Sequence, residues 1–159
     1  MSDAPILRMR RDLSLPVPEP SWPAGVSVRG FADGDAAAVH ALLERAYANG
    51  GGSVAALAEW FPAMTGDPEF DPDLWFMARA GDALAGVALC WTSAFLKDLA
   101  VDDTWRRHGL GTALLHHLLG EFAARGAARV DLKVDAGNPS GARRVYERAG
   151  FVVVEQLPS

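Results

Sequence analysis

The feature that most constrains this sequence is a strand, a basic glycine-containing loop and a long apolar helix in direct succession. Residues 95–101 are typical of a strand, and residues 102–109 form the loop Asp-Asp-Thr-Trp-Arg-Arg-His-Gly. Residues 110–124 repeat leucine and phenylalanine at the three- and four-residue spacing of a helix with one apolar stripe. A helix that follows a strand so closely packs its stripe against a sheet, so the stretch predicts an α/β fold.

The start of this helix is predicted to bind a phosphate group. The first amides of a helix lack intrahelical partners, and the helix dipole places partial positive charge beside them. Gly109 and Gly111 leave room for an anion, while Arg106 and Arg107 add fixed positive charge. No Walker run exists, and Leu114 stands where a dinucleotide fingerprint needs a small residue. Two interpretations stay open: a pyrophosphate cradle, or glycines that only permit close helix packing.

The remaining pattern predicts a mixed, mostly antiparallel central sheet with helices on both faces. Gly81-Asp82 is a hairpin signal between two apolar strands, and a third strand completes an antiparallel meander. Ser53 is expected to cap a second helix, and Asn138-Pro139-Ser140 to open the last one with proline in its first turn. In chain order we expect strand 26–31, helix 36–48, helix 53–63, strands 74–80, 84–91 and 95–101, helix 110–124, strand 129–134, helix 138–149 and strand 151–155.

The whole chain, residues 1–159, is expected to be a single domain. Its core spans residues 26–156. Residues 1–25 precede this core with a candidate strand at 6–13 and a connector that contains four prolines. Prolines at this density remove backbone donors and favour extended chain, so the connector is predicted to run over the surface.

Composition and charge exclude several classes of protein. The net charge of -5 lacks the concentrated basic face of a nucleic-acid-binding protein. No run approaches the ~20 apolar residues of a membrane helix, and no signal peptide is evident, so we expect a cytoplasmic protein without a membrane partner. The single cysteine, Cys90, excludes an intrachain disulfide and suits a reducing compartment. His116 and His117 point ~100° apart on a helix, so no metal site is expected.

Two segments in the right order resemble the GNAT superfamily of N-acetyltransferases. Arg106-x-x-Gly109-x-Gly111 is similar to the Arg/Gln-x-x-Gly-x-Gly/Ala signature of that family, and residues 98–102 look like its central strand. Residues 138–151 resemble its second motif, with asparagine at the helix start, tyrosine on the helix and Gly-Phe opening the next strand. The resemblance covers about residues 26–155, and more loosely residues 132–151 are similar to the second domain of mycothiol synthases.

The resemblance implies a GNAT-like acyltransferase fold and a role for each matching position. The pantetheine arm of acetyl-CoA would lie along the central strand, the pyrophosphate on the loop amides, and Asn138 against the arm. Tyr146 would lie near the thioester sulfur. The implied donor-binding residues are Leu99, Ala100, Val101, Arg106, Arg107, His108, Gly109, Leu110, Gly111, Thr112 and Asn138.

The implied activity moves an acetyl group from acetyl-CoA, the acyl donor, to a primary amine by direct attack in a ternary complex. Tyr146 would protonate the leaving thiolate, although its place on an apolar stripe also suits a core aromatic residue. Asp98 would accept a proton or bind a cationic substrate, or have no role. Asp35, Glu44 and Glu59 are alternatives on the helices that frame the acceptor site in this family.

Two other functions stay open at this stage. One is a non-catalytic acyl-CoA-binding module or half of a larger GNAT assembly, which would bind CoA without turnover. The other is a nucleotide- or NAD-binding protein that uses residues 109–111 as its phosphate loop. The acceptor is a small-molecule or peptide amine that the sequence does not identify. A homodimer is compatible with the sequence, but no periodic interface stripe establishes one.

The chain departs from the family pattern after residue 155. GNAT domains usually have one more strand after the Gly-Phe strand, and only four residues follow here. A missing strand would leave a long exposed sheet edge, which proteins avoid. We therefore expect residues 6–13 to fill the vacant place beside Val152–Val154, within one chain or swapped between two, as in the second half of tandem GNAT proteins.

Overall fold

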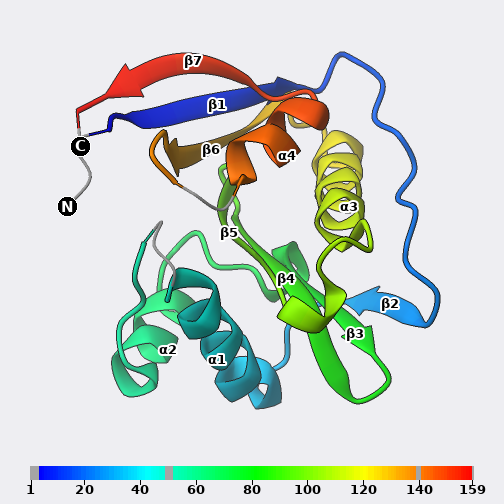
Figure 1. The fold of residues 1–159 in the computed structure, drawn as a ribbon, viewed down its shortest axis with the longest axis vertical. Coiled ribbons are helices and arrows are strands. Elements are labelled where there is room, and N and C mark those ends of the chain that lie inside the picture. The colour runs from blue at the N-terminus through cyan, green and yellow to red at the C-terminus, as the bar shows by residue number, and fades with distance from the viewer. Residues whose placement is uncertain (1–3, 49–51, 139–140, 159) are drawn as a thin grey trace.

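A seven-stranded sheet forms the centre of the structure, a computed structural model that describes residues 4–48, 52–138 and 141–158. The strand order is β2-β3-β4-β5-β6-β1-β7 (Figure 1). Every neighbouring pair is antiparallel except β5 and β6, which confirms the mixed, mostly antiparallel sheet. The strands are β1 (Ile6–Asp12), β2 (Val26–Arg29), β3 (Trp75–Ala80), β4 (Ala83–Trp91), β5 (Phe95–Val101), β6 (Arg129–Asp135) and β7 (Val152–Leu157).

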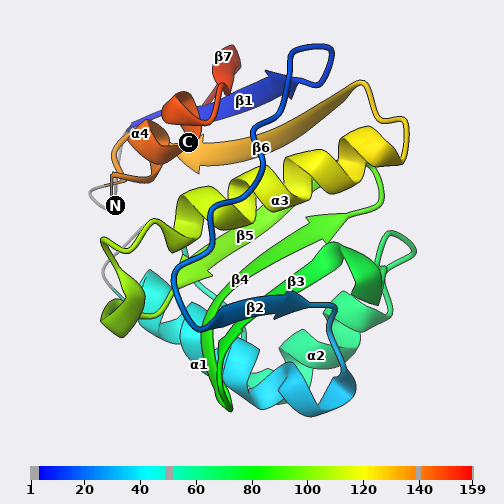
Figure 2. The same cartoon turned by 90° about the vertical axis from the view of Figure 1, so that its right-hand side faces the viewer.

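Helices cover both faces of this sheet, as the sequence pattern predicts. On one face α1 (Ala36–Tyr47) and α2 (Leu57–Thr65) enclose an aromatic-rich core around Trp60 and Trp75. On the other face α3 (Leu110–Ala124) and α4 (Ala142–Arg148) enclose a leucine-rich core. Figures 1 and 2 show the two pairs of helices on opposite sides of the strands. The sheet therefore carries two separate cores, one on each face.

Strand β1 lies inside the sheet between β6 and β7 and pairs with both of them in the same chain. The side chains of β1 alternate as a central strand requires: Leu7, Met9 and Arg11 are buried, while Ile6, Arg8 and Arg10 are half-buried on the other face. The proline-containing connector then crosses over α3 to reach β2 (Figure 2). The ring centroids of Trp22 and His117 lie 5.7 Å apart at this crossing.

Lowering the pH below about 6.5 is expected to destabilise the contact between the connector and α3. Burial lowers the pKa of both His116 and His117, so the folded state favours the neutral rings. The unfolded chain binds more protons as the pH falls through the ordinary histidine range, so the free energy of unfolding decreases there. Denaturation midpoints at pH 7.5 and 5.5 measure this effect. His117→Gln should flatten the dependence, and an unchanged slope would contradict the assignment.

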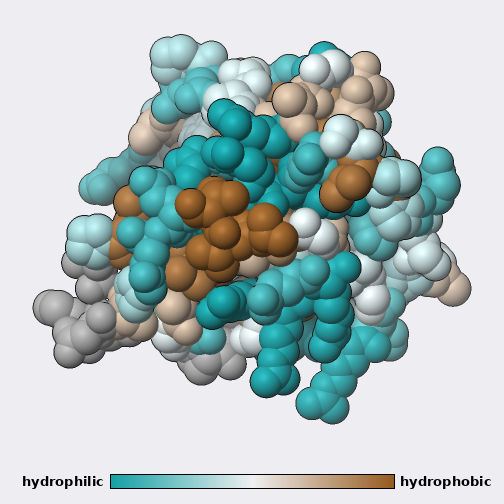
Figure 3. All heavy atoms as spheres, turned by 90° about the horizontal axis from the view of Figure 1, so that it is seen from above, coloured by the Kyte–Doolittle hydropathy of each residue, from teal (hydrophilic) through white to brown (hydrophobic). Residues whose placement is uncertain are grey.

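Strand β7 forms an edge of the sheet and exposes apolar side chains. Val152, Val153 and Val154 have exposed fractions of 60%, 40% and 43%. Figure 3, which looks onto the molecule from the side of β7, shows apolar side chains gathered on this face. An edge strand of this kind is a favourable surface for pairing with another strand.

Two helix starts differ from the prediction. The second helix begins at Leu57 rather than Ser53, and its cap residue Ala56 makes no side-chain bond. The reason is that His40 Nε2 lies 2.6 Å from the carbonyl oxygen of Ala55, which holds the preceding residues out of the helix. The last helix begins at Ala142, after Gly141 in a left-handed conformation.

The chain turns at residues 136–137, and Asn138 is not in the helix that the sequence predicts to start there. Its turn places the amide of Asn138 3.0 Å from the carbonyl oxygen of Asp135, and the amide of Gly137 2.7 Å from Oδ1 of the same residue. The predicted first-turn proline and the serine after it lie outside the described residues. Asp135 therefore closes the end of β6 before the chain enters α4.

Candidate active site

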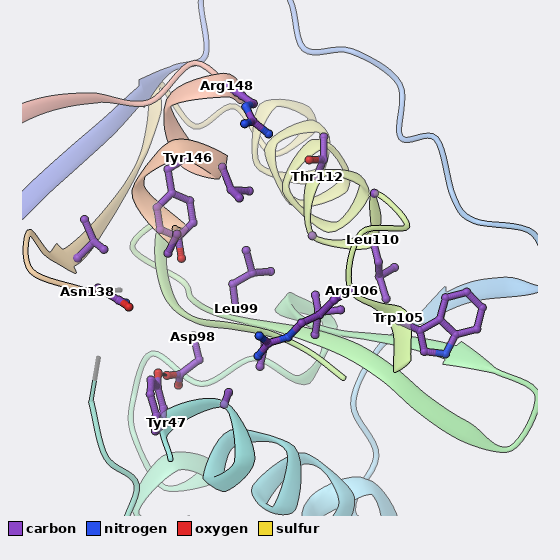
Figure 4. A pocket seen from close by; sticks show the side chains of 18 of the residues that line it. Tyr47, Asp98, Leu99, Trp105, Arg106, Leu110, Thr112, Asn138, Tyr146 and Arg148 are labelled. Carbon is purple, nitrogen blue, oxygen red and sulfur yellow. Dashed lines mark hydrogen bonds between the residues drawn. The ribbon is translucent and has the colours of Figure 1, made fainter. Parts of the chain in front are cut away.

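A cleft opens where β5 and β6 diverge. The two strands pair in parallel, with Phe95 opposite Asp131 and Leu96 opposite Leu132, and their pairing ends there. Beyond this point a cavity of about 660 Å³ lies between the strands, bounded by the ends of α1 and β6 and by the starts of α3 and α4 (Figure 4). On its other edge, β5 pairs with β4 as far as Val101. The backbone groups of residues 98–101 that face β6 are therefore the ones available to a ligand.

A β-bulge in β5 sets the direction of its side chains at the cleft. Cys90 of β4 pairs with Leu96, whereas Leu89 pairs with Asp98, so Lys97 is an additional residue without a cross-strand partner in this register. The usual alternation shifts by one position. Leu96 therefore belongs to the core under α3, while Ala100 belongs to the core under α1. Asp98 consequently meets the end of α1 at the floor of the cleft (Figure 4).

The N-terminus of α3 forms another wall of the cleft. Gly109 precedes the helix with φ of 79°, a left-handed conformation that favours glycine. The first helical bond runs from the amide of Ala113 to the carbonyl of Gly109, so the amides of residues 110–112 precede the hydrogen-bonded ladder. At Gly111 an added Cβ would lie 3.8 Å from Val101, an ordinary van der Waals contact, so alanine fits here.

The charges around the cavity favour an anion. Its acidic lining residues are Asp98 and Asp135, and the first of these is already bound by neighbouring side chains. The cationic side chains outnumber them, although the whole chain has a net charge of -5. Such a local excess of positive charge concentrates anionic ligands at the cleft. The cationic lining residues are Lys97, Arg106, Arg107, Lys133 and Arg148.

Asp98 and the phenol of Tyr47 meet at the floor of the cleft, and a second phenol, Tyr146, lines the same cavity. Asp98 is only 4% exposed, and it accepts a hydrogen bond at Oδ1 from the hydroxyl of Tyr47. Its Oδ2 lies 3.0 Å from Lys97 Nζ. Burial raises the pKa of Tyr47, and the charge of Asp98 raises it further. Burial and the same carboxylate raise the pKa of Tyr146 to about 12, so both phenols are proton donors at neutral pH.

Tyr146 projects from α4 into the cleft (Figure 4). Its ring packs edge-on against Phe151, with 5.9 Å between the centroids, and belongs to the core under α3. The side chain is buried and lines the cavity as well. Tyr146 thus packs as a core aromatic residue and also lines the cavity.

Most of the predicted site residues line this one cavity. His108 does not line it: its exposed ring lies against Trp105, with 5.5 Å between the centroids. Most predicted residues line the cavity because they are close in sequence: residues 98–112 supply the strand, the loop and the helix start. The predicted residues that line the cavity are Asp98, Leu99, Ala100, Val101, Arg106, Arg107, Gly109, Leu110, Gly111, Thr112, Asn138 and Tyr146.

The alternative carboxylates lie outside the cavity lining. Asp35 accepts from Arg29 Nη2 at 2.7 Å and lies 3.6 Å from Arg79, an ion cluster that holds the start of α1. Glu44 lies 3.3 Å from His40 on the same helix. Glu59 is in the first turn of α2, where a carboxylate complements the helix dipole. Asp98 is the candidate carboxylate that the fold brings to the cleft.

Several lining residues escape the sequence prediction. Tyr47 is the last residue of α1 and contacts the carboxylate of Asp98, 51 positions later in the chain. No local sequence pattern predicts a contact over this separation. Lys97 is adjacent to Asp98 and would point away from it in a regular strand, so only the bulge explains their contact. The others are Ala46, Trp105, Lys133, Val134, Asp135, Ala142, Val145 and Arg148.

Among residues 4–48, 52–138 and 141–158, no group of three or more histidine, cysteine, aspartate or glutamate side chains is placed to hold a metal ion. Their helices also include none with the length and apolar character needed to cross a membrane. Cys90 is buried in the sheet, and burial raises the pKa of its thiol, which keeps the group protonated.

The fold and the cleft agree with the comparison against known families. The profile of the acetyltransferase (GNAT) family matches residues 36–151. This range contains the strand, the glycine loop, α3 and the helix that carries Tyr146. The chain belongs to the GNAT family of acetyltransferases.

Individual relatives share this assignment and are about twice as long. The chain is 34% identical to a mycothiol acetyltransferase of Thermobispora bispora, over 91% of this chain and 52% of that protein. It is 36% identical to one of Streptomyces scabiei, over 93% of this chain and 50% of that protein. A crystal structure of a GCN5-related N-acetyltransferase from Sphaerobacter thermophilus superposes with a TM-score of 0.81 at 31% identity, over 98% of this chain and 50% of that one. The chain spans about half the length of these relatives.

Proposed function

We propose that this protein transfers an acetyl group from acetyl-CoA to a primary amine by direct attack in a ternary complex. The observation that carries the proposal is the cleft between β5 and β6. It joins the amides at the start of α3 to the buried Asp98 and Tyr146 within one cavity. The relatives named as mycothiol acetyltransferases make a small amine one candidate acceptor.

The donor end of the cleft suits the chemistry of CoA. Its pyrophosphate would accept hydrogen bonds from the amides of residues 110–112, with Arg106 and Arg107 supplying charge. The pantetheine arm carries amides, and the β6-facing backbone groups of residues 98–101 would bind them in the manner of an added strand. Asn138 lines the same passage. This arrangement would direct the thioester toward Tyr146.

The acceptor end supplies the proton transfers. Asp98 would accept one proton from the substrate ammonium, and the neutral amine would attack the thioester carbonyl, forming the C–N bond. A backbone amide at Leu99 or Ala100 would stabilise the oxyanion, a contribution of about 3 kcal/mol. The C–S bond then breaks, and the CoA thiolate takes the proton of Tyr146. The second nitrogen proton leaves to solvent, Asp98 releases its proton to solvent, and Tyr146 recovers its proton from solvent.

Acetyl-CoA and CoA are expected to raise the melting temperature, whereas ATP and NAD should leave it nearly unchanged. A ligand at 100 times its dissociation constant adds ~2.7 kcal/mol, which corresponds to a shift of several degrees. Gly111→Trp should abolish the shift because the new ring fills the cleft beside Val101. Gly111→Ala is the matched control and should keep it.

Turnover of a panel of amines, followed by release of free CoA thiol, completes this test. Binding of CoA with no turnover on any amine would support a non-catalytic acyl-CoA-binding module instead. A larger shift with ATP or NAD than with CoA would overturn the proposal.

A further inference from the structure

We propose that Tyr47 is a positioning residue that orients the carboxylate of Asp98 toward the acceptor amine. This inference rests on the proposed function, in which Asp98 receives the proton of the substrate ammonium. Tyr47 is the last residue of α1, and Asp98 follows the bulge of β5, so the contact joins two elements across the cleft floor. Figure 4 shows the Tyr47 hydroxyl directed at the Asp98 carboxylate.

The surroundings of Asp98 explain why it needs such a partner. A carboxylate that is only 4% exposed loses most of its hydration, so its oxygens need hydrogen-bond partners within the protein. Hydrogen bonds to a charged group are the strong ones that replace lost hydration. Oδ1 accepts from Tyr47 and Oδ2 pairs with Lys97, so the two oxygens are fixed by two different elements. The plane of the Asp98 carboxylate is therefore set by its contacts with the side chains of Tyr47 and Lys97.

The two tyrosines that line the cavity have different roles in this arrangement. The Tyr47 proton is committed to Asp98, and because its pKa is raised, Tyr47 stays a donor throughout the working pH range. The hydroxyl of Tyr146 appears in no hydrogen bond assigned among residues 4–48, 52–138 and 141–158, and its side chain lines the cavity. Tyr146 is thus free to give its proton to the thiolate, while Tyr47 orients the base.

The test uses Tyr47→Phe, which removes one oxygen and keeps the ring. In ¹³C-labelled protein, Asp98→Asn identifies the carboxyl resonance of residue 98 by its loss. We expect Tyr47→Phe to move the titration midpoint of that resonance to higher pH, because a hydrogen bond to the charged form is lost. The chain has two tyrosines, so Tyr146→Phe is the matched control, and it should move the midpoint much less.

Catalysis provides the second measurement, with alaninamide as the probe amine. The acidic limb of kcat/KM against pH should shift upward in Tyr47→Phe, while the thermal shift with CoA is preserved. A merely structural tyrosine would change neither midpoint, and an unchanged resonance in Tyr47→Phe would overturn the inference. If the midpoint moves but the wild type binds no CoA, the Tyr47–Asp98 pair stands and the proposed function fails.

Discussion

Replacing Tyr146 with phenylalanine is expected to lower kcat about 10²- to 10⁴-fold, the range for loss of a general acid. The reason is that Tyr146 is the buried proton donor that lines the cleft, with a pKa raised to about 12. Phenylalanine keeps the ring packing against Phe151, so the fold and the site for CoA should persist. Single-turnover release of CoA thiol measures the chemical step, and the thermal shift with CoA measures binding.

The pH dependence separates this role from a purely structural one. Because the pKa of Tyr146 is about 12, the wild-type rate should not lose its acid below about pH 10. If Tyr146 were only a core aromatic residue, phenylalanine would preserve the rate. A loss of less than about fivefold in kcat would therefore contradict the assignment, as would a loss of the CoA shift with normal chemistry.

The donor side of the cleft is predictable because its signals are local in the sequence. The apolar period of residues 110–124 gives α3, and the glycines before it mark the loop. A strand that leads into such a loop delivers its last residues and the first helical amides to one place. Sequence order alone thus brings most of residues 98–112 to a single cavity.

The acceptor side is not predictable in the same way because it depends on contacts between distant segments. The end of α1 reaches Asp98 only after the whole β3–β5 meander has formed. The bulge at Lys97 is a register shift between strands, and the composition of β5 gives no sign of it. The predicted start of α2 at Ser53 is wrong for a related reason. The contact of His40 with the carbonyl of Ala55 lies between distant residues, and no side-chain cap marks the observed start at Leu57.

Replacing Arg11 with methionine is expected to lower the free energy of unfolding by about 3 kcal/mol, within the range for disrupting a buried charged hydrogen-bond network. Arg11 is only 5% exposed and points from β1 toward the helix face. Its guanidinium donates to the carbonyl oxygens of Ala149 at 2.9 Å, Asp12 at 2.6 Å, Leu15 at 3.3 Å and Pro16 at 2.8 Å. Methionine fills much of the volume but leaves the carbonyl at the buried Ala149 contact, and the three part-buried carbonyls, without this donor.

The same contact connects the N-terminal strand to the candidate site. Ala149 ends the helix that carries Tyr146, so Arg11 ties the last turn of α4 to β1 and to the start of the connector. Arg8→Met is the matched control on the opposite face of β1. Asp131, the partner of Arg8, would still pair with Arg10 at 2.8 Å, so the free energy of unfolding should fall by less than about 1 kcal/mol. Urea denaturation of both variants measures the difference. Equal effects at the two positions would show that β1 is held by strand pairing alone and that α4 does not depend on Arg11.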